Sequence, residues 1–193
     1  ANQQKTKAGT WTFGPFVEYG HGSYSSYLND GTHGRGKISY LGGGIMANYT
    51  QKNGVWVEGS LHGGRAKSDY SGSVYTGTVS TYDGSSSYYA AHLGVGKETR
   101  VHRKDTLNTY LRYFYSHQAG MHATLNTGED YTFDSVNSHR LRIGLRYSHK
   151  DSAYSQVYAG LAFEYEFDGE ARASFQGYNT PSPSLKGASG MLE

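Results

Sequence analysis

The chain has 193 residues, a size typical of one domain, and a formal net charge of +2 that gives no argument for nucleic-acid binding. It contains no cysteine, which excludes disulfide scaffolds, cysteine-ligated zinc sites and thiol enzymes. Its 27 glycines and 19 tyrosines, with hydrophobic residues at 36%, favour strands and turns over helices.

Alternation of apolar and polar residues along the chain predicts eight strands. In chain order they cover residues 11–20, 37–49, 55–66, 87–97, 107–116, 134–148, 154–167 and, in part, 185–193. Such strands are longer than the usual length of about five or six residues, and they match the roughly 9–11 tilted residues that cross a bilayer. The chain has no apolar run long enough for a membrane helix, but a transmembrane barrel does not need one, because only alternate residues meet lipid.

The clearest alternation lies in the strands expected at 107–116, 134–148 and 154–167. One row of each strand is apolar, and we expect its residues to face lipid: Leu141, Ile143, Leu145, Val157, Leu161, Phe163 and Tyr165. The other row carries most of the charge, and we expect it to line the lumen of a barrel: Tyr110, Arg112, Arg140, Arg142, Arg146, Tyr158, Glu164 and Glu166. In a soluble sandwich the same charged row would simply be solvated. The strand at 37–49 contains Gly42-Gly43-Gly44, and its faces are not assigned.

The predicted connections alternate between long and short. Polar loops are expected at 21–36, 67–86, 117–133 and 168–184, and shorter turns at 50–54, 98–106 and 149–153. This segregation is typical of an antiparallel outer-membrane barrel. Aromatic residues near strand ends are candidates for girdles at the membrane surfaces: Trp11, Tyr19, Tyr40, Tyr49, Trp56, Tyr88, Tyr89, Tyr115, Tyr147 and Tyr154.

Short blocks in this order resemble the β-domain of bacterial autotransporters, the translocators of type V secretion. The matching blocks are Gly14-Pro15-Phe16-Val17-Glu18-Tyr19-Gly20, Val57-Glu58-Gly59-Ser60, Gly63-Gly64-Arg65, Ala91-His92-Leu93-Gly94-Val95-Gly96, Ser138-His139-Arg140-Leu141-Arg142, Ile143-Gly144-Leu145-Arg146-Tyr147, Tyr158-Ala159-Gly160, Phe163-Glu164-Tyr165-Glu166-Phe167-Asp168-Gly169 and Leu185-Lys186-Gly187-Ala188-Ser189-Gly190. Together they span nearly all of residues 11–193.

The resemblance implies an all-β, antiparallel, up-and-down transmembrane barrel in the outer membrane of a Gram-negative bacterium. Such a barrel anchors an N-terminal passenger and supports its export to the cell surface. The implied partners are the lipid bilayer, the outer-membrane assembly machinery and the chain's own passenger. No passenger or linker helix precedes Trp11, so residues 1–193 are interpreted as an interior part of a larger β-domain. We therefore expect the isolated chain not to support export.

No enzyme, cofactor or metal is expected. The chain contains neither Gly-x-Ser-x-Gly nor His-Glu-x-x-His, and its nine histidines are scattered along the sequence. Two other functions stay open at this point. One is a self-contained small outer-membrane barrel that acts as an adhesin or porin, because eight strands are enough to close a barrel. The other is a soluble β-sandwich module that binds its ligand through exposed tyrosines.

Overall fold

The computed structural model describes residues 1–27, 33–73, 79–152 and 155–193, and this part of the chain contains strands but no helix. The strands are β1 (Asn2–Lys5), β2 (Gly9–Tyr27), β3 (His33–Gln51), β4 (Val55–Ser73), β5 (Val79–Arg100), β6 (Asp105–Gln118), β7 (Met121–Thr124), β8 (Asp130–Phe133), β9 (Val136–Lys150), β10 (Gln156–Glu166), β11 (Ala173–Phe175), β12 (Tyr178–Asn179) and β13 (Gly187–Leu192). The predicted all-β, antiparallel class is confirmed.

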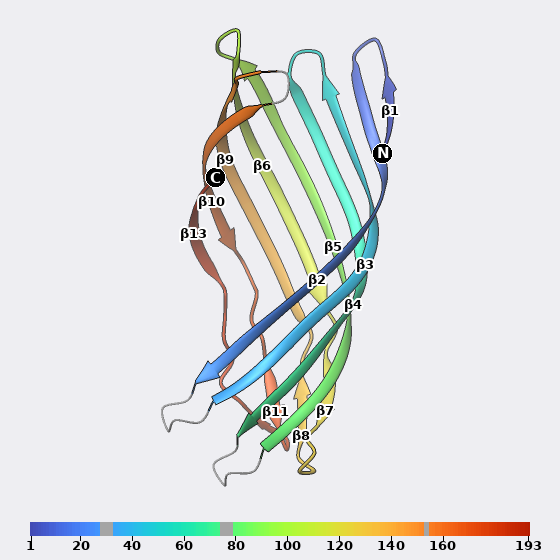
Figure 1. Cartoon of the computed structure of the whole chain (residues 1–193), viewed down its shortest axis with the longest axis vertical. Coiled ribbons are helices and arrows are strands. Elements are labelled where there is room, and N and C mark those ends of the chain that lie inside the picture. The colour runs from blue at the N-terminus through green and yellow to red at the C-terminus, as the bar shows by residue number, and fades with distance from the viewer. Residues whose placement is uncertain (28–32, 74–78, 153–154) are drawn as a thin grey trace.

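The long strands form one curved sheet, called sheet A here. Its nine strands follow the order β1-β2-β3-β4-β5-β6-β9-β10-β13, and every pair is antiparallel. Figure 1 shows these strands side by side as a tilted, open half-pipe, with tight turns at its upper end. Within the described residues the sheet is not closed, and β1 and β13 form its edges. The up-and-down order is the one expected from the sequence; β1 was not predicted.

The register of sheet A fixes which residues share a face, because directly opposite residues of antiparallel strands point to the same side. Arg112 of β6 lies opposite Gly94 of β5 on one side and Arg142 of β9 on the other. The same rule assigns the faces of β3, since Gly42 lies opposite Glu18. The alternation that the sequence shows on single strands is therefore continuous across the sheet.

Two expected loops are mostly strand. Residues 21–27 and 33–36 extend β2 and β3, and residues 67–73 and 79–86 extend β4 and β5. These segments lack apolar alternation because both of their faces are polar, yet their Tyr, Ser and Thr residues still form a hydrogen-bonded ladder. The loop tips at 28–32 and 74–78, and the girdle candidate Tyr154, lie outside the described residues.

The other two expected loops, 117–133 and 168–184, contain a second sheet at the lower end of Figure 1. This sheet B has the order β12-β11-β8-β7. The turn between β7 and β8 also covers the free edge of β5. There the Asn126 side chain accepts a hydrogen bond from the Thr81 N–H (3.0 Å) and donates one to the Val79 carbonyl (3.1 Å). This contact mimics a neighbouring strand and satisfies an exposed sheet edge.

The molecule has no conventional core, since a single curved sheet buries side chains only on its concave side. Trp56 and Tyr110 are among the most buried apolar side chains described, at 7% and 4% exposure. Each ring lies across a glycine of the opposite strand. A Cβ atom at Gly96 would lie 2.4 Å from the Trp56 ring, and one at Gly144 would lie 2.5 Å from the Tyr110 ring. Glycines thus let large rings lie flat against the sheet.

Candidate functional site

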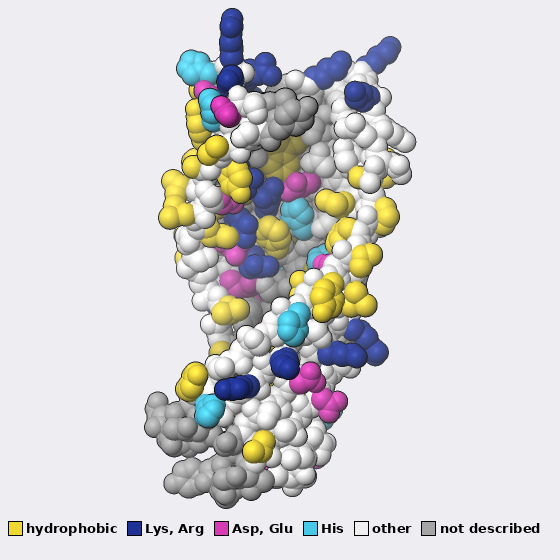
Figure 2. All heavy atoms as spheres, in the orientation of Figure 1, with side chains coloured by type: hydrophobic (Ala, Val, Ile, Leu, Met, Phe, Trp, Pro, Cys, Tyr) yellow, Lys and Arg dark blue, Asp and Glu magenta, His cyan; other side chains and the backbone are white. Residues whose placement is uncertain are grey.

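The concave face of sheet A carries a continuous set of ionisable side chains, called the charged face here. Figure 2 shows Lys, Arg, Asp, Glu and His side chains gathered in the hollow. All eight residues predicted to line a lumen lie on or border this face, and the register adds others from β2 to β5. The charged face consists of Glu18, Glu58, His62, Tyr88, His92, Tyr110, Arg112, Arg140, Arg142, Arg146, Tyr158, Glu164, Glu166 and Glu193.

The first cluster joins β9 and β10. Arg142 lies directly opposite Glu164, and its Nε and Nη2 atoms are each 2.7 Å from Glu164 Oε2. Arg140 bridges the two acids: its Nη1 lies 3.5 Å from Glu164 Oε1 and its Nε lies 3.8 Å from Glu166 Oε2. Because Glu164 is only 8% exposed, these guanidinium groups offset the cost of burying its carboxylate.

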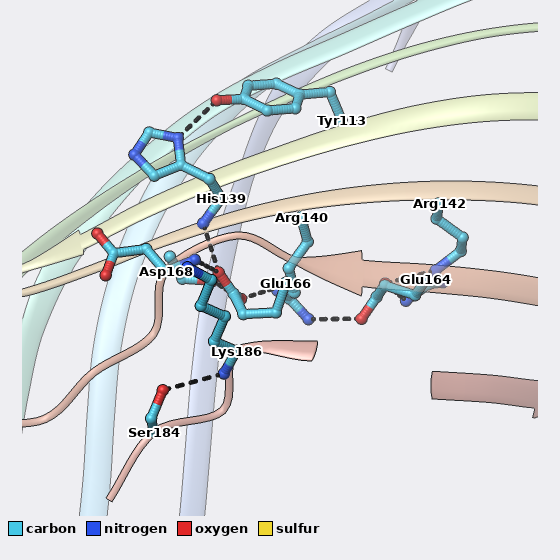
Figure 3. Close-up of polar contacts among 10 residues, drawn as sticks. Tyr113, His139, Arg140, Arg142, Glu164, Glu166, Asp168, Ser184 and Lys186 are labelled. Carbon is cyan, nitrogen blue, oxygen red and sulfur yellow. Dashed lines mark hydrogen bonds and ion pairs between the residues drawn. The ribbon is translucent and has the colours of Figure 1, made fainter. Parts of the chain in front are cut away.

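Glu166 also fixes the end of β10, as Figure 3 shows. Its carboxylate accepts hydrogen bonds from the Ser138 hydroxyl (2.5 Å), the His139 backbone N–H (2.8 Å) and the Asp168 backbone N–H (3.1 Å). These bonds hold the chain where it leaves the sheet. Glu166 therefore contributes to structure as well as to the charged lining.

A second cluster lies on β4, β5 and β6. Arg112 Nε donates to Glu58 Oε1 over 2.8 Å, and His92 Nε2 lies 3.2 Å from the same oxygen. Further along β4 and β5, His62 Nδ1 lies 2.9 Å from the carboxylate of Glu18 on β2, and the Tyr88 hydroxyl donates a hydrogen bond to the same carboxylate over 2.5 Å. Each acid is thus paired across strands.

A third cluster lies toward the short-turn end. Arg146 donates to Glu193 over 2.5 Å, and the Tyr110 hydroxyl donates to the same carboxylate over 2.9 Å. The Tyr158 ring lies 4.7 Å from the Arg146 guanidinium carbon, a cation–π distance. Sequence reasoning did not find His62, Tyr88, His92 or Glu193, because pairing across strands depends on register.

The opposite face of sheet A carries an exposed apolar band. Six of the seven residues predicted to face lipid are at least 37% exposed: Leu141, Ile143, Leu145, Val157, Leu161 and Phe163. Tyr165 is half-buried because its ring packs against Phe167 at a centroid distance of 4.9 Å. The register continues this apolar band across β2 to β6 through Val17, Leu41, Ile45, Val57, Leu61, Leu93, Val95 and Leu111. A continuous exposed surface of this kind needs an apolar environment to cover it.

The girdle prediction is wrong for Tyr40, Trp56 and Tyr88. These residues lie on the charged side of the sheet, at positions that alternate with the apolar band. Trp56 donates from its ring nitrogen to Asn108 over 2.9 Å, and Tyr88 contacts Glu18. Nearness to a strand end does not determine which face a ring takes. The described candidates on the band side are Trp11, Tyr19, Tyr49, Tyr89, Tyr115 and Tyr147.

A hydrogen bond between two ionisable side chains lies at the short-turn end of β6, beyond the apolar band. His149 Nδ1 lies 2.6 Å from Asp105 Oδ1, and this hydrogen bond lowers the pKa of the Asp105 carboxyl. In the described ranges no group of three or more His, Asp or Glu residues has the arrangement of a metal site. Nor do those ranges contain a helix with the length and apolar character needed to cross a membrane.

A curved antiparallel sheet with an apolar outer band and a charged inner face defines the class of transmembrane β-barrel proteins. The family model for the autotransporter β-domain matches residues 3–193, so the chain belongs to the autotransporter β-domain family. This membership assigns it to the outer-membrane translocators of type V secretion. No curated protein matches the chain.

Proposed function

We propose that this chain forms the wall of an outer-membrane pore through which an N-terminal passenger reaches the cell surface. The observation that carries the proposal is the division of one sheet into an exposed apolar band and a charged face. The band supplies a surface for lipid, while paired Arg and Glu side chains keep the concave side polar. A polypeptide in transit needs such a hydrated wall, because its own backbone groups must remain hydrogen-bonded.

We further propose that the passenger and the outer-membrane assembly machinery are its protein partners and that the chain has no catalytic activity. The acids of the charged face are engaged by neighbouring cations or hydroxyl groups, a pattern that supports packing of the wall. If the passenger is released by cleavage, Glu18→Gln and Glu58→Gln should leave the release rate unchanged. A slower release with the barrel intact would show a chemical role.

The export proposal is tested with a reporter peptide placed ahead of Ala1 in the natural polypeptide that carries this chain. Antibody labelling and protease treatment of intact cells should show the reporter at the surface. Two variants calibrate the assay: Leu161→Arg on the apolar band should reduce insertion strongly, and Tyr158→Arg on the charged side should reduce it much less. A folded barrel in the outer membrane with the reporter left in the periplasm would contradict export.

Topology is tested separately by inserting a protease site into one turn at each end of the sheet. The turn at 125–128, between β7 and β8, should be cut on intact cells, because the long hairpins are proposed to face outward. The turn at 52–54, between β3 and β4, should be cut only after the outer membrane is opened. The reverse pattern would invert the orientation.

A further inference from the structure

Four cations stand together on the outward side of β3 and β4: Arg35, Lys37, Arg65 and Lys67. We call them the cationic patch. Arg65 lies directly opposite Leu41, and Lys37 lies opposite Asp69, so the register assigns the patch to the side of the apolar band. Figure 2 shows dark blue and magenta side chains together on the lower, protruding part of the sheet.

The cationic patch is exposed, and in the part of the chain that the structure describes none of its members makes an ion pair. Asp69 and Asp83 are its nearest acids in the register, both in the row of Lys37. On the neighbouring strands the rows of Arg65 and Lys67 carry serines, Ser87 and Ser85 of β5. Among the residues that the structure describes, the four cations outnumber these two aspartates, so the patch keeps a net positive charge.

The cationic patch begins at the border of the apolar band and extends away from it, since Arg65 lies directly opposite Leu41. Arg65 follows Leu61 by four residues on β4, and Lys37 precedes Leu41 by four residues on β3. At about 3.3 Å per residue and a tilt of about 40°, four residues advance about 10 Å along the membrane normal. Polar head groups begin where the apolar band ends, and Lys and Arg side chains reach several ångströms further from the backbone.

A polar groove of about 580 Å³ adjoins the patch. Arg35 and Lys37 line one part of it, and the acids Asp69 and Asp83 line another. The hairpin of β7 and β8 contributes Thr124 and the Asn126 side chain that covers the edge of β5. The groove therefore combines cations with carboxylates, hydroxyls and an amide within one space.

We propose that the cationic patch and its groove bind the head group of a phosphorylated glycolipid in the outer leaflet. Arg and Lys recognise phosphate oxygens, whereas carboxylate, amide and hydroxyl groups bind sugar hydroxyls. The acyl chains of the same lipid would lie along the apolar band beside Leu41, Ile45 and Leu61, which are all about 60% exposed. The inference rests on the proposed function, since the long hairpins must lie on the outer side.

The test titrates the full chain, refolded in neutral detergent micelles, with lipid A that carries both phosphates and with its dephosphorylated form. Two paired variants remove the cations, Arg65→Gln with Lys67→Gln and Arg35→Gln with Lys37→Gln. The matched control, Lys52→Gln with Arg103→Gln, removes the same charge from exposed short turns at the other end of the sheet. Each cation near a lipid surface changes affinity about fivefold, so each patch pair should weaken binding about 25-fold at low salt.

The control pair should stay within about twofold of the wild type, and dephosphorylated lipid A should bind the wild type as weakly as a patch variant binds the phosphorylated lipid. Equal losses in patch and control variants would overturn the inference, as would phosphatidylglycerol binding as tightly as lipid A. Insertion of the same proteins into phosphatidylcholine vesicles is measured in parallel. Normal insertion with no phosphate preference removes only this inference, whereas failed insertion of the wild type counts against the proposed function.

Discussion

The assignment of the two faces is tested most directly by placing an arginine on each of them. Leu161 lies in the middle of the outward row of β10, which runs from Val157 to Tyr165, and it is 55% exposed. Its position is about 10 Å from either end of that row along the membrane normal, so it lies near the bilayer midplane. An arginine there costs about 2–4 kcal/mol, or about 30- to 900-fold in the folding equilibrium.

Tyr158 is the matched control on the charged side, because it is on the same strand and 54% exposed. Tyr158→Arg loses the cation–π contact with Arg146, which is worth about 0.5–1 kcal/mol, and the new guanidinium stays hydrated. Ala162 would be a poor control: it is only 9% exposed, and its strand neighbour Gly144 is covered by the Tyr110 ring.

The assay is urea-induced unfolding of the full chain from phosphatidylcholine vesicles, followed by tryptophan fluorescence. The chain has two tryptophans, and they report from different faces: Trp11 from the apolar band side and Trp56 from the concave side. Leu161→Arg should lower the free energy of unfolding by about 2–4 kcal/mol and Tyr158→Arg by about 1 kcal/mol. Equal losses, or a larger loss for Tyr158→Arg, would refute the assignment of the faces.

Gly54→Ala should destabilise the chain by about 1–3 kcal/mol, because Gly54 has φ +86° and a Cβ there would lie 2.1 Å from a carbonyl oxygen. Gly128→Ala should cost less in the same urea assay, because Gly128 has a similar φ of +96° but no atom lies within 4 Å of the added Cβ. Equal losses of stability in the two variants would show that the close carbonyl oxygen at Gly54 does not matter. Asp105 has a lowered pKa through its histidine partner, so its contribution to stability is present above the unfolded pKa of about 4 and is lost as the pH falls through the lower folded value. Unfolding curves from about pH 6 to about pH 3 should therefore fall more steeply for the wild type than for Asp105→Asn, and parallel curves would contradict this role. Glu58→Gln should lower the free energy of unfolding by about 1–3 kcal/mol, because it leaves Arg112 without its acid. Adding Arg112→Gln should recover part of that loss. Strictly additive losses in the double-mutant cycle would show that the pair is not coupled.

The faces of a strand could be predicted best from the sequence where one of the two faces is apolar. On β9 and β10 the alternation separates Leu141 from Arg142 and Phe163 from Glu164, and the structure places these neighbours on opposite faces. The strand ends were harder to predict. Beyond the apolar band both faces are polar, so residues 67–73 carry no period-two signal although they are hydrogen-bonded strand.

The partners within the charged face could not be predicted from single strands. His62 lies two strands away from Glu18, and the Tyr110 hydroxyl reaches Glu193 across 83 residues of sequence. Such contacts depend on the strand register, because a slip of one residue would move every side chain of the strand to the other face. Sequence patterns alone give the composition of a face but not its pairing.

The rings of Trp56 and Tyr110 lie flat because the residue opposite each of them is a glycine, which has no side chain. This flat arrangement sets the width of the concave side. Any side chain introduced at Gly96 or Gly144 would push Trp56 or Tyr110 off the sheet and into the hollow of the concave side. A single methyl group at either position would thus narrow the hollow by moving an aromatic ring much larger than itself. The free width of the concave side therefore depends on two glycines that have no side chain to project into it.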